Sequence, residues 1–311
     1  MSSLFLVSLL AAGTATAHVA LWDPGMYGFN GSNNAVANYD NRDPSQPLRL
    51  DHALITSEWF GHGFQHLPPK DGDFMILPAG GTYHGEVSCI RSQTSYGRPG
   101  ATDDLPEYAC KEVDSLHTIL NLGEETDSKW LGGCALAIAY ESDVTKVKPE
   151  DFVVLSVNHE CVWKRKVNFE IPEDIPACPP GGCHCTWNWI HEAVWADEGV
   201  DGLDGSAQYN LLCASTETTH TVGAPQVPVE CLDDSSRCIK GAKMPMYFAQ
   251  AEGYNIVTSN PPLYNDMMGF SDGAQDDILI ETPAKSKRSA TQEMDLIERK
   301  IRHHKRSPGR L

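Results

Sequence analysis

Gly133-Cys134-Ala135-Leu136-Ala137-Ile138-Ala139-Tyr140 is a continuous stretch without charged residues near the middle of the chain. A short apolar run of this kind predicts a buried β-strand. A second run follows at residues 152–159, after a polar connection. Further strand-like runs occupy residues 74–77, 83–87, 167–171, 186–190 and 209–213. Short strands, frequent turn residues and few helical patterns predict an all-β protein built as a β-sandwich.

Residues 18–70 differ from this pattern, because they are rich in Gly, Asn, Asp and Pro. They predict long loops around short strands. Six aromatic residues in this region could form a binding face or pack the loops down, and packing is the default expectation: Trp22, Tyr27, Phe29, Trp59, Phe60 and Phe64. Residues 91–130 are polar and loop-like, and a short helix or turn over residues 112–122 contains His117.

The first 17 residues predict a secretory signal peptide. An apolar run at residues 4–12 is followed by small residues ending in Ala15-Thr16-Ala17, which has the form of an Ala-x-Ala cleavage site. Cleavage after Ala17 makes His18 the first residue of the mature protein. No other apolar run approaches the ~20 residues that a membrane span needs, so we expect a secreted, extracellular protein.

An N-terminal histidine is a chelating group. Its α-amine and its imidazole Nδ1 can bind one metal ion together, and a second histidine adds a third nitrogen. Three nitrogens in this arrangement suit Cu(II), which favours nitrogen ligands in a square plane. The α-amine must lose its proton to bind, and its ordinary pKa of about 7.7–8.0 lies close to neutral pH. The sequence therefore predicts one copper ion per chain.

The charge of the chain is strongly uneven. The net charge of the 311 residues is −18. Residues 285–311 hold nine Lys or Arg against three Asp or Glu, so this tail is +6 and the rest of the chain is −24. An acidic body repels nucleic acid but does not oppose binding to a neutral polysaccharide. We expect a globular domain over residues 18–281 and a disordered or removed tail over residues 282–311.

The chain has ten cysteines, none in the predicted signal peptide. An even number in a secreted protein favours disulfides, up to five here. The spacing of Cys178, Cys183, His184 and Cys185 could also suit zinc, but disulfides are the better interpretation in this compartment. The single sequon, Asn30-Gly31-Ser32, is expected in a glycosylated surface loop.

Several of these stretches resemble one family. His18 to Tyr27, Ser156 to Trp163, Cys178 to Cys185 with the following Trp187-Asn188-Trp189-Ile190-His191, and Gly269 to Gln275 are similar to the fungal lytic polysaccharide monooxygenases of auxiliary activity family fourteen. The matches run from His18 to about Asp277. The resemblance implies an immunoglobulin-like β-sandwich, a copper site called a histidine brace, an axial tyrosine, and oxidative action on xylan that coats cellulose.

Carried onto this chain, the resemblance implies that His18 supplies the amine and Nδ1. His117 is the expected second histidine, because it lies in a polar stretch at a family-like distance from the mature start. Tyr209 is the expected axial ligand. His191 and Gln208 are expected beside the metal, where they would hydrogen-bond the oxygen co-substrate. Nine histidines compete for the second position, and the others are His52, His62, His66, His84, His159, His184, His191 and His220.

Two other classes of protein fit parts of the sequence. A secreted copper-binding protein could use the same brace without cleaving sugar, and a flat aromatic face beside the copper would argue against it. A hydrolytic glycosidase would use two carboxylates, but no acidic motif stands out among the 42 Asp and Glu. For the monooxygenase we expect a monomer that needs a polysaccharide substrate, an external electron donor and O2 or H2O2, with no nucleic-acid or membrane partner.

Overall fold

The computed structural model describes residues 19–46, 48, 54–101, 104–110, 131–190, 220–248, 250–257 and 262–280, and the backbone of residues 207–214 and 281. The chain divides into two units, Met1–Ile280 and Glu281–Leu311. All of the described residues except Glu281 belong to the first unit. Among the described residues, no helix is both long and apolar enough to cross a bilayer.

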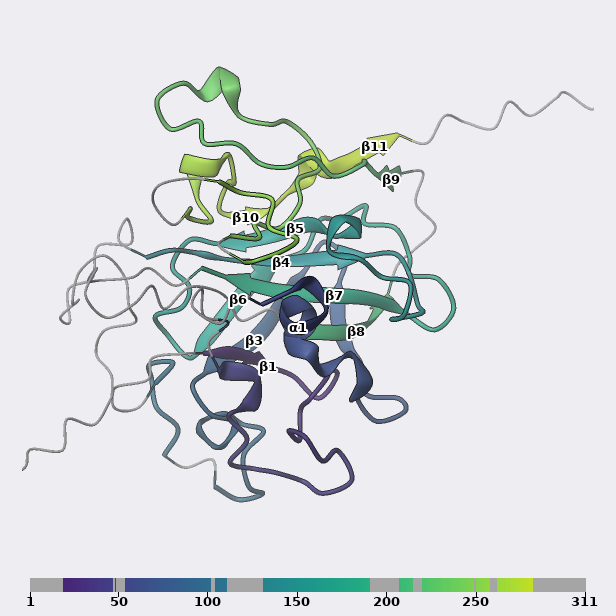
Figure 1. The fold of residues 1–311 in the computed structure, drawn as a ribbon, viewed down its shortest axis with the longest axis vertical. Coiled ribbons are helices and arrows are strands. Elements are labelled where there is room, and N and C mark those ends of the chain that lie inside the picture. The colour runs from purple at the N-terminus through teal and green to yellow at the C-terminus, as the bar shows by residue number, and fades with distance from the viewer. Residues whose placement is uncertain are drawn as a thin grey trace, which may run out of the picture. The chain divides into compact units, whose positions relative to one another are not determined.

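The described part of the chain is mostly β (Figure 1). Eleven strands are described: β1 (Ala20–Trp22), β2 (Met75–Pro78), β3 (Thr82–Ser88), β4 (Cys134–Ala139), β5 (Val153–Asn158), β6 (Lys166–Glu170), β7 (Cys183–Trp189), β8 (Ala207–Ala214), β9 (His220–Val222), β10 (Gly273–Ala274) and β11 (Leu279–Glu281). The predicted strands are confirmed. The loop-rich start of the chain holds β1 as its strand, together with short helices.

Helices are short throughout the described residues. The described part of the chain contains one α-helix, α1 (Thr56–Trp59). The 3₁₀ helices are η1 (Asp43–Ser45), η3 (Phe60–His66), η4 (Arg91–Gln93), η6 (Pro149–Asp151), η7 (Ser235–Arg237), η8 (Asp266–Met268) and η9 (Asp276–Ile278). The predicted helix or turn over residues 112–122 lies outside the described residues.

The strands form three sheets. The largest has six strands in the order β10-β5-β4-β7-β8-β2, and a second has the order β1-β3-β6. β11 and β9 form a third pair. The pairs inside the second sheet and most of those inside the first are antiparallel, whereas β2 and β8 run parallel, with Met75 opposite Leu211.

The position of β4 between two hydrophobic clusters explains why its sequence is apolar at every position. Successive residues of a strand face opposite sides of the sheet. Leu136 and Ile138 pack into a cluster shared with β1, β3 and β6. Ala135 and Ala137 pack into a second cluster with large aromatic side chains such as Phe152 and Phe270. Small alanines therefore face the aromatic cluster, larger side chains face the neighbouring sheet, and neither side of β4 meets solvent.

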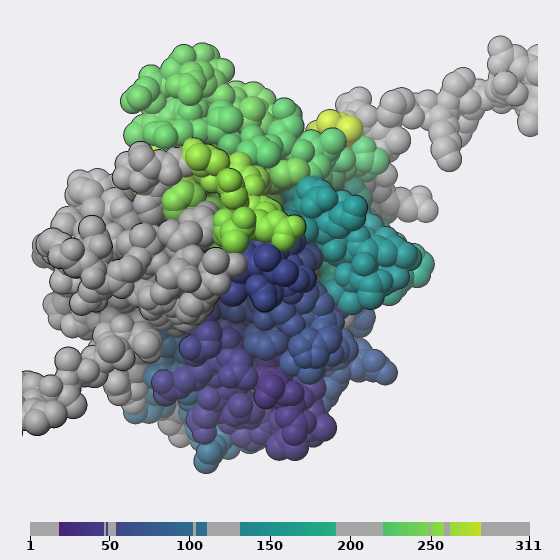
Figure 2. Space-filling view, viewed as in Figure 1, coloured from purple at the N-terminus to yellow at the C-terminus, as the bar shows by residue number. Residues whose placement is uncertain are grey.

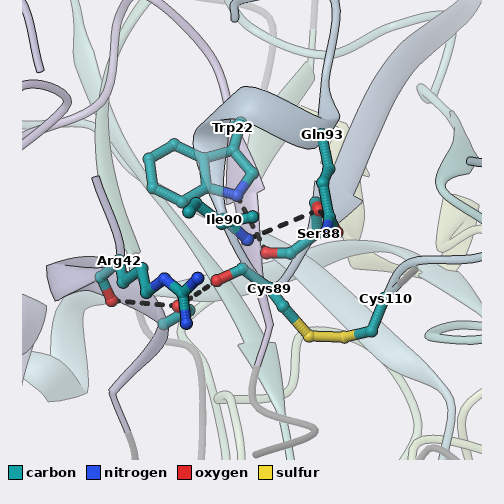
Figure 3. Close-up of a disulfide and its surroundings, with 8 residues drawn as sticks. Trp22, Arg42, Ser88, Cys89, Ile90, Gln93 and Cys110 are labelled. Atoms are coloured by element: carbon teal, nitrogen blue, oxygen red, sulfur yellow. Dashed lines mark hydrogen bonds between the residues drawn. A yellow bond between two sulfur atoms is a disulfide. The ribbon is translucent and has the colours of Figure 1, made fainter. Parts of the chain in front are cut away.

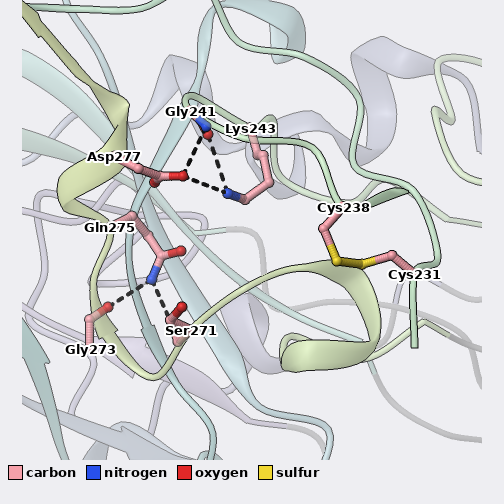
Figure 4. A network of polar contacts seen from close by, with 8 residues as sticks. All are labelled: Cys231, Cys238, Gly241, Lys243, Ser271, Gly273, Gln275 and Asp277. Atoms are coloured by element: carbon pink, nitrogen blue, oxygen red, sulfur yellow. Dashed lines mark hydrogen bonds and ion pairs between the residues drawn. A yellow bond between two sulfur atoms is a disulfide. The ribbon is translucent and has the colours of Figure 1, made fainter. Parts of the chain in front are cut away.

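Polar contacts and a disulfide connect parts of the chain between Cys231 and Asp277 (Figure 4). Asp277 accepts a hydrogen bond from the Gly241 N–H at 2.8 Å and lies 3.7 Å from Lys243 Nζ. The Gln275 amide donates to the carbonyls of Ser271 and Gly273 at 2.8 and 3.0 Å. Burial lowers the pKa of Lys243, and the nearby Asp277 opposes that shift.

Candidate copper site

One end of the six-stranded sheet gathers the chain segments that carry the predicted site residues. The register places Cys134, the first residue of β4, opposite Trp189, the last residue of β7. It also places Cys134 opposite Asn158 at the end of β5, and Trp187 opposite Ala207 at the start of β8. Residues 111–130 lead into β4, and residues 191–206 connect β7 to β8. Both segments therefore attach to this end.

The start of β4 is fixed there by close backbone packing. Gly132 accepts a hydrogen bond from the Tyr264 N–H at 2.7 Å. Gly133 has φ +65°, and a Cβ at this position would come within 2.3 Å of the Tyr264 carbonyl oxygen. Only glycine fits both the backbone conformation and the space. This explains the glycine pair that precedes the apolar run.

The three-stranded sheet reaches the same end. Residues 159–165 connect the end of β5 to the start of β6, and the Asn158 amide donates to the Asn168 carbonyl at 3.0 Å. The Cys134–Cys161 disulfide links this connection to β4. β3 pairs with the start of β6 through Glu86 and Lys166, and with β1 through Ser88 and Ala20. β1, which begins two residues after His18, therefore starts at this end.

A second disulfide ties the segment that leads to His117 to the partner strand of β1 (Figure 3). Cys89 follows β3 directly and is bonded to Cys110. The Cys89 N–H donates to the Ala109 carbonyl at 3.2 Å, and the Ala109 N–H donates to the Trp163 carbonyl at 3.1 Å. The buried Trp22 indole donates to the Ser88 carbonyl at 2.9 Å. Cys110, the last described residue before His117, is thus bonded to the residue that follows β3, and β3 pairs with β1, the strand that follows His18.

The five predicted site residues lie partly outside this description. His18, His117 and His191 are outside the described residues. Gln208 and Tyr209 belong to β8, which is described by its backbone, and they pair with Thr186 and Cys185 of β7. The site assignments therefore remain predictions. The segments that lead to His18, His117 and His191 attach at one end of the two sheets, whereas Tyr209 pairs with Cys185, which pairs with Ile138, four residues along β4 from Cys134.

Several competing histidines have structural partners. His84 lies on β3 as predicted, and its Nδ1 is 2.7 Å from the Asn168 side-chain oxygen. His159 lies one residue beyond β5, not on it, and its Nε2 is 3.0 Å from the Phe270 carbonyl. The others in described segments are placed as follows: His62 stacks on Phe64, His66 Nδ1 meets the Gly63 carbonyl, and His220 lies 3.7 Å from Asp174.

His184 is the most buried of these histidines. Its Nδ1 is 2.7 Å from the Glu141 carbonyl and its Nε2 is 3.0 Å from the Tyr27 hydroxyl. A carbonyl only accepts, so Nδ1 carries the proton and Nε2 accepts from Tyr27. Burial lowers the pKa of His184, and the Glu141 carbonyl opposes that shift. The side chain is a neutral structural residue that links the loop after β1 to β7.

The alternative zinc site is not supported. Cys178 and Cys183 form a disulfide, and His184 has the partners just described. A fourth disulfide joins Cys231 to Cys238. Within the described ranges, no group of three or more His, Cys, Asp or Glu side chains could hold a metal ion. The disulfide interpretation is confirmed for eight of the ten cysteines, and four such bonds fit an oxidising, extracellular environment.

The structure also brings an aromatic pair to this end that sequence reasoning missed. The rings of Tyr108 and Trp163 are 6.1 Å apart, and Lys164 Nζ lies 4.3 and 4.4 Å from the two ring centres. Both rings are partly exposed. Tyr108 and Lys164 face each other in an isolated β-bridge, and this long-range pairing has no local signal. In contrast, four of the six aromatics weighed as a binding face are buried core residues: Trp22, Tyr27, Trp59 and Phe60.

The predicted surface loop around the sequon needs a correction. Ser32 is exposed, but Asn30 is only 8 % exposed. The Asn30 side-chain oxygen accepts a hydrogen bond from Arg91 Nη1 at 2.6 Å. A buried arginine next to the loop draws the asparagine inward, which the sequon itself does not reveal.

Comparison with known proteins decides the family. The family model described as lytic polysaccharide monooxygenase AA14 matches residues 1–305. This chain belongs to the AA14 family of lytic polysaccharide monooxygenases. Membership of the family implies an oxidoreductase that uses copper to cleave polysaccharide oxidatively.

Individual relatives agree with the family match. AA14 family lytic polysaccharide monooxygenase A of Trametes coccinea is 38 % identical over 90 % of this chain and 65 % of its own length. Monooxygenase B of Pycnoporus cinnabarinus is 39 % identical over 85 % of this chain and 71 % of its own. Monooxygenase B of Trametes coccinea is 36 % identical, with coverage of 91 % and 68 %. The chain thus spans about two thirds of the length of these relatives.

Proposed function

We propose that this chain is a secreted, copper-dependent monooxygenase that cleaves xylan, in particular xylan that coats cellulose. His18 and His117 would hold the copper as a histidine brace, with Tyr209 as a further ligand. The copper, once reduced by an external donor, would activate O2 or H2O2 for oxidation of a glycosidic carbon. The two sheets that share one hydrophobic cluster support an immunoglobulin-like sandwich as the scaffold.

The observation that carries the proposal is the link between β1 and Cys110. Ala20 pairs with Ser88, and the next residue, Cys89, is bonded to Cys110. His18 is two residues from one side of this link and His117 is seven residues from the other. Seven extended residues span up to about 25 Å, so both histidines can reach one metal ion. A neutral imidazole and a deprotonated α-amine fit the nitrogen preference of Cu(II).

The protein's own residues would contribute to the reaction by placing the metal ligands, the oxygen co-substrate and the polysaccharide. The Cys89–Cys110 disulfide and β1 fix the described chain next to both of the segments that carry the proposed nitrogen ligands. His191 and Gln208 would donate hydrogen bonds beside the metal and steer a proton to the oxygen co-substrate. Tyr108 and Trp163 provide partly exposed aromatic surface at the same end, where a polysaccharide chain could pack.

Calorimetric titration of the mature chain with Cu(II) tests the brace. His117→Ala removes one of three nitrogens, and we expect copper affinity to fall by at least about a hundredfold, since loss of a group that only hydrogen-bonds a ligand already costs about ten- to a hundredfold. His84→Ala is the matched control, since His84 contacts Asn168, and its affinity should equal that of the wild type. Unchanged affinity in His117→Ala would exclude His117 as a ligand.

A second test addresses the mature start and the activity. An extra Met before His18 moves the α-amine away from the imidazole, so the Cu(II) EPR spectrum should change and affinity should drop. With copper and ascorbate, the mature protein should release oxidised oligosaccharides from xylan-coated cellulose, as measured by mass spectrometry. Retained copper with no oxidised product from xylan, cellulose or their mixture would favour the copper-binding protein instead.

A further inference from the structure

A cavity of about 600 Å³ lies between the loop that follows β1 and the segment before β2. Its wall includes Phe29, Asn30 and Tyr39 on one side, and Pro68 and Asp73 on the other. Arg91, from η4, also lines it. The segments that contribute these residues form the purple and blue surface in Figure 2. This volume is large enough for a ligand of one or two sugar units.

Arg91 is an unusual residue for this position. It is 6 % exposed, and no carboxylate of the described residues lies within ion-pair distance of its guanidinium. Burial of a charged group without an opposite charge is costly, so buried charges are normally paired. Burial also lowers the pKa of Arg91. No carboxylate of the described residues therefore pairs with its positive charge.

The guanidinium is nevertheless held in one position. Its Nε donates to the Tyr96 carbonyl at 2.9 Å, and Nη1 donates to the Asn30 side-chain oxygen at 2.6 Å and the Asn38 carbonyl at 3.3 Å. The guanidinium carbon lies 3.8 Å from the ring centre of Phe29 and 5.1 Å from that of Tyr39. Such fixation prepares the group to meet a ligand without further ordering.

The remaining nitrogen is the one that a ligand can use. Nη2 makes no hydrogen bond to a described residue, and it is not among the buried polar atoms that lack a partner, so it keeps access to solvent. Arginine is the side chain best suited to carboxylates. The rest of the wall combines rings and prolines with amide and carboxylate groups, a mixture that matches the C–H faces and hydroxyls of a pyranose.

We propose that this cavity binds the uronic acid side group of a xylan-type polysaccharide, with its carboxylate at Arg91. This inference deepens the proposed function, because it adds a charged side group to the substrate. Arg91 is two residues from Cys89, which is bonded to Cys110, the last described residue before His117. A side group held in the cavity would thus place the main chain near the end of the molecule that carries the candidate copper ligands.

Binding without copper tests the proposal independently of turnover. The mature, metal-free chain, shown by intact mass to carry no glycan at Asn30, is titrated calorimetrically with three probes. These are a xylo-oligosaccharide with one glucuronic acid side group, the unsubstituted oligosaccharide of equal length, and free glucuronic acid. We expect the substituted oligosaccharide to bind at least about tenfold more tightly than the other two, the scale of one charge-assisted hydrogen bond.

Two sets of variants locate the binding. Arg91→Gln should reduce the affinity for the substituted oligosaccharide to that of the unsubstituted one. Since loss of Arg91 could impair folding, a second pair uses the exposed Ala37, which also lines the cavity. Ala37→Glu and Ala37→Gln add side chains of equal size, and the added negative charge should make Glu about two- to fivefold weaker than Gln.

Equal affinity for the substituted and unsubstituted probes would overturn the proposal, as would equal affinity of the two Ala37 variants. Tighter binding of free glucuronic acid than of the substituted oligosaccharide would overturn it too, because the cavity would then exclude the polymer. Selective binding combined with no oxidised products from any xylan would keep the cavity assignment and reject the monooxygenase proposal. Oxidised products without selective binding would reject the cavity assignment and keep the monooxygenase proposal.

Discussion

At the scale of single residues, the fold neutralises one histidine and buries one arginine. His184 donates through Nδ1 to a carbonyl and accepts at Nε2 from the Tyr27 hydroxyl. Burial lowers its pKa below the ordinary 6.5, and this effect outweighs the Glu141 carbonyl and the nearby charges of Glu141 and Asp143, which favour the protonated ring. The Arg91 guanidinium is held by carbonyl and amide oxygens and by the rings of Phe29 and Tyr39.

The lowered pKa of His184 predicts a pH dependence of stability. As the pH falls through about 6.5, the unfolded chain takes up a proton that the folded chain resists, so the free energy of unfolding decreases toward the folded pKa. Each unit of difference between the two pKa values contributes about 1.4 kcal/mol. His184→Gln removes this component, and the loss of stability between pH 7.5 and pH 5 should shrink.

Urea unfolding at the two pH values measures this effect. His84→Gln is the matched control, because His84 is an exposed histidine on β3, and it should keep the pH dependence of the wild type. If His184→Gln loses as much stability on acidification as the wild type, His184 is not the source of the effect.

At the scale of elements, a disulfide positions the segment that leads to a candidate ligand. Cys89–Cys110 closes a loop of 21 residues beside β1. Replacing both cysteines with serine should cost about 2–4 kcal/mol of stability and should lower copper affinity at least tenfold, because the segment toward His117 is then tethered by backbone bonds alone. Titration with Cu(II) and thermal unfolding give the two readouts.

The Cys231–Cys238 disulfide offers the control. It closes a loop of 7 residues in the region shown in Figure 4. Its double serine variant should lose stability but bind copper as the wild type does. Equal copper affinities in the two double variants would show that Cys89–Cys110 does not position the site.

β4 gives a prediction about packing. Ala137 is fully buried against the aromatic cluster. Ala137→Leu adds volume where none is available and should destabilise the protein by about 1–3 kcal/mol, as measured by thermal unfolding. Ile76→Leu, at an exposed position of β2, should leave the melting temperature nearly unchanged. An Ala137→Leu variant with an unchanged melting temperature would mean that this face of the sheet is loosely packed.

At the scale of the whole molecule, the body and the tail carry net charges of opposite sign. Residues 285–311 carry +6 and the rest −24. Exposed ion pairs contribute about 0–1 kcal/mol each and are screened by salt, whereas fixing one backbone residue costs about 1–2 kcal/mol. Truncation after Pro283 should therefore leave copper affinity and melting temperature unchanged relative to the full mature chain. A melting temperature several degrees lower would show that the tail packs on the body.

The sequence alone determined strands β2 to β8, the family, and the expectation that the cysteines form disulfides. These features depend on local composition, such as the apolar run at 133–140, or on motifs such as Cys178-x4-Cys183 and the histidine after Ala17. The candidate ligands His18, His117 and Tyr209 also come from the sequence, and their assignment remains a prediction. Such signals need no knowledge of which distant segments meet.

Only the tertiary structure decided which segments meet. The pairing of Cys89 with Cys110, the parallel contact of β2 with β8 and the common end of the sheets all join residues far apart in the chain. The burial of Arg91 and Asn30 has the same origin, because both are polar residues whose usual place is the surface. Side-chain environments of this kind arise from long-range packing, and the short-range pattern of a sequence does not contain them.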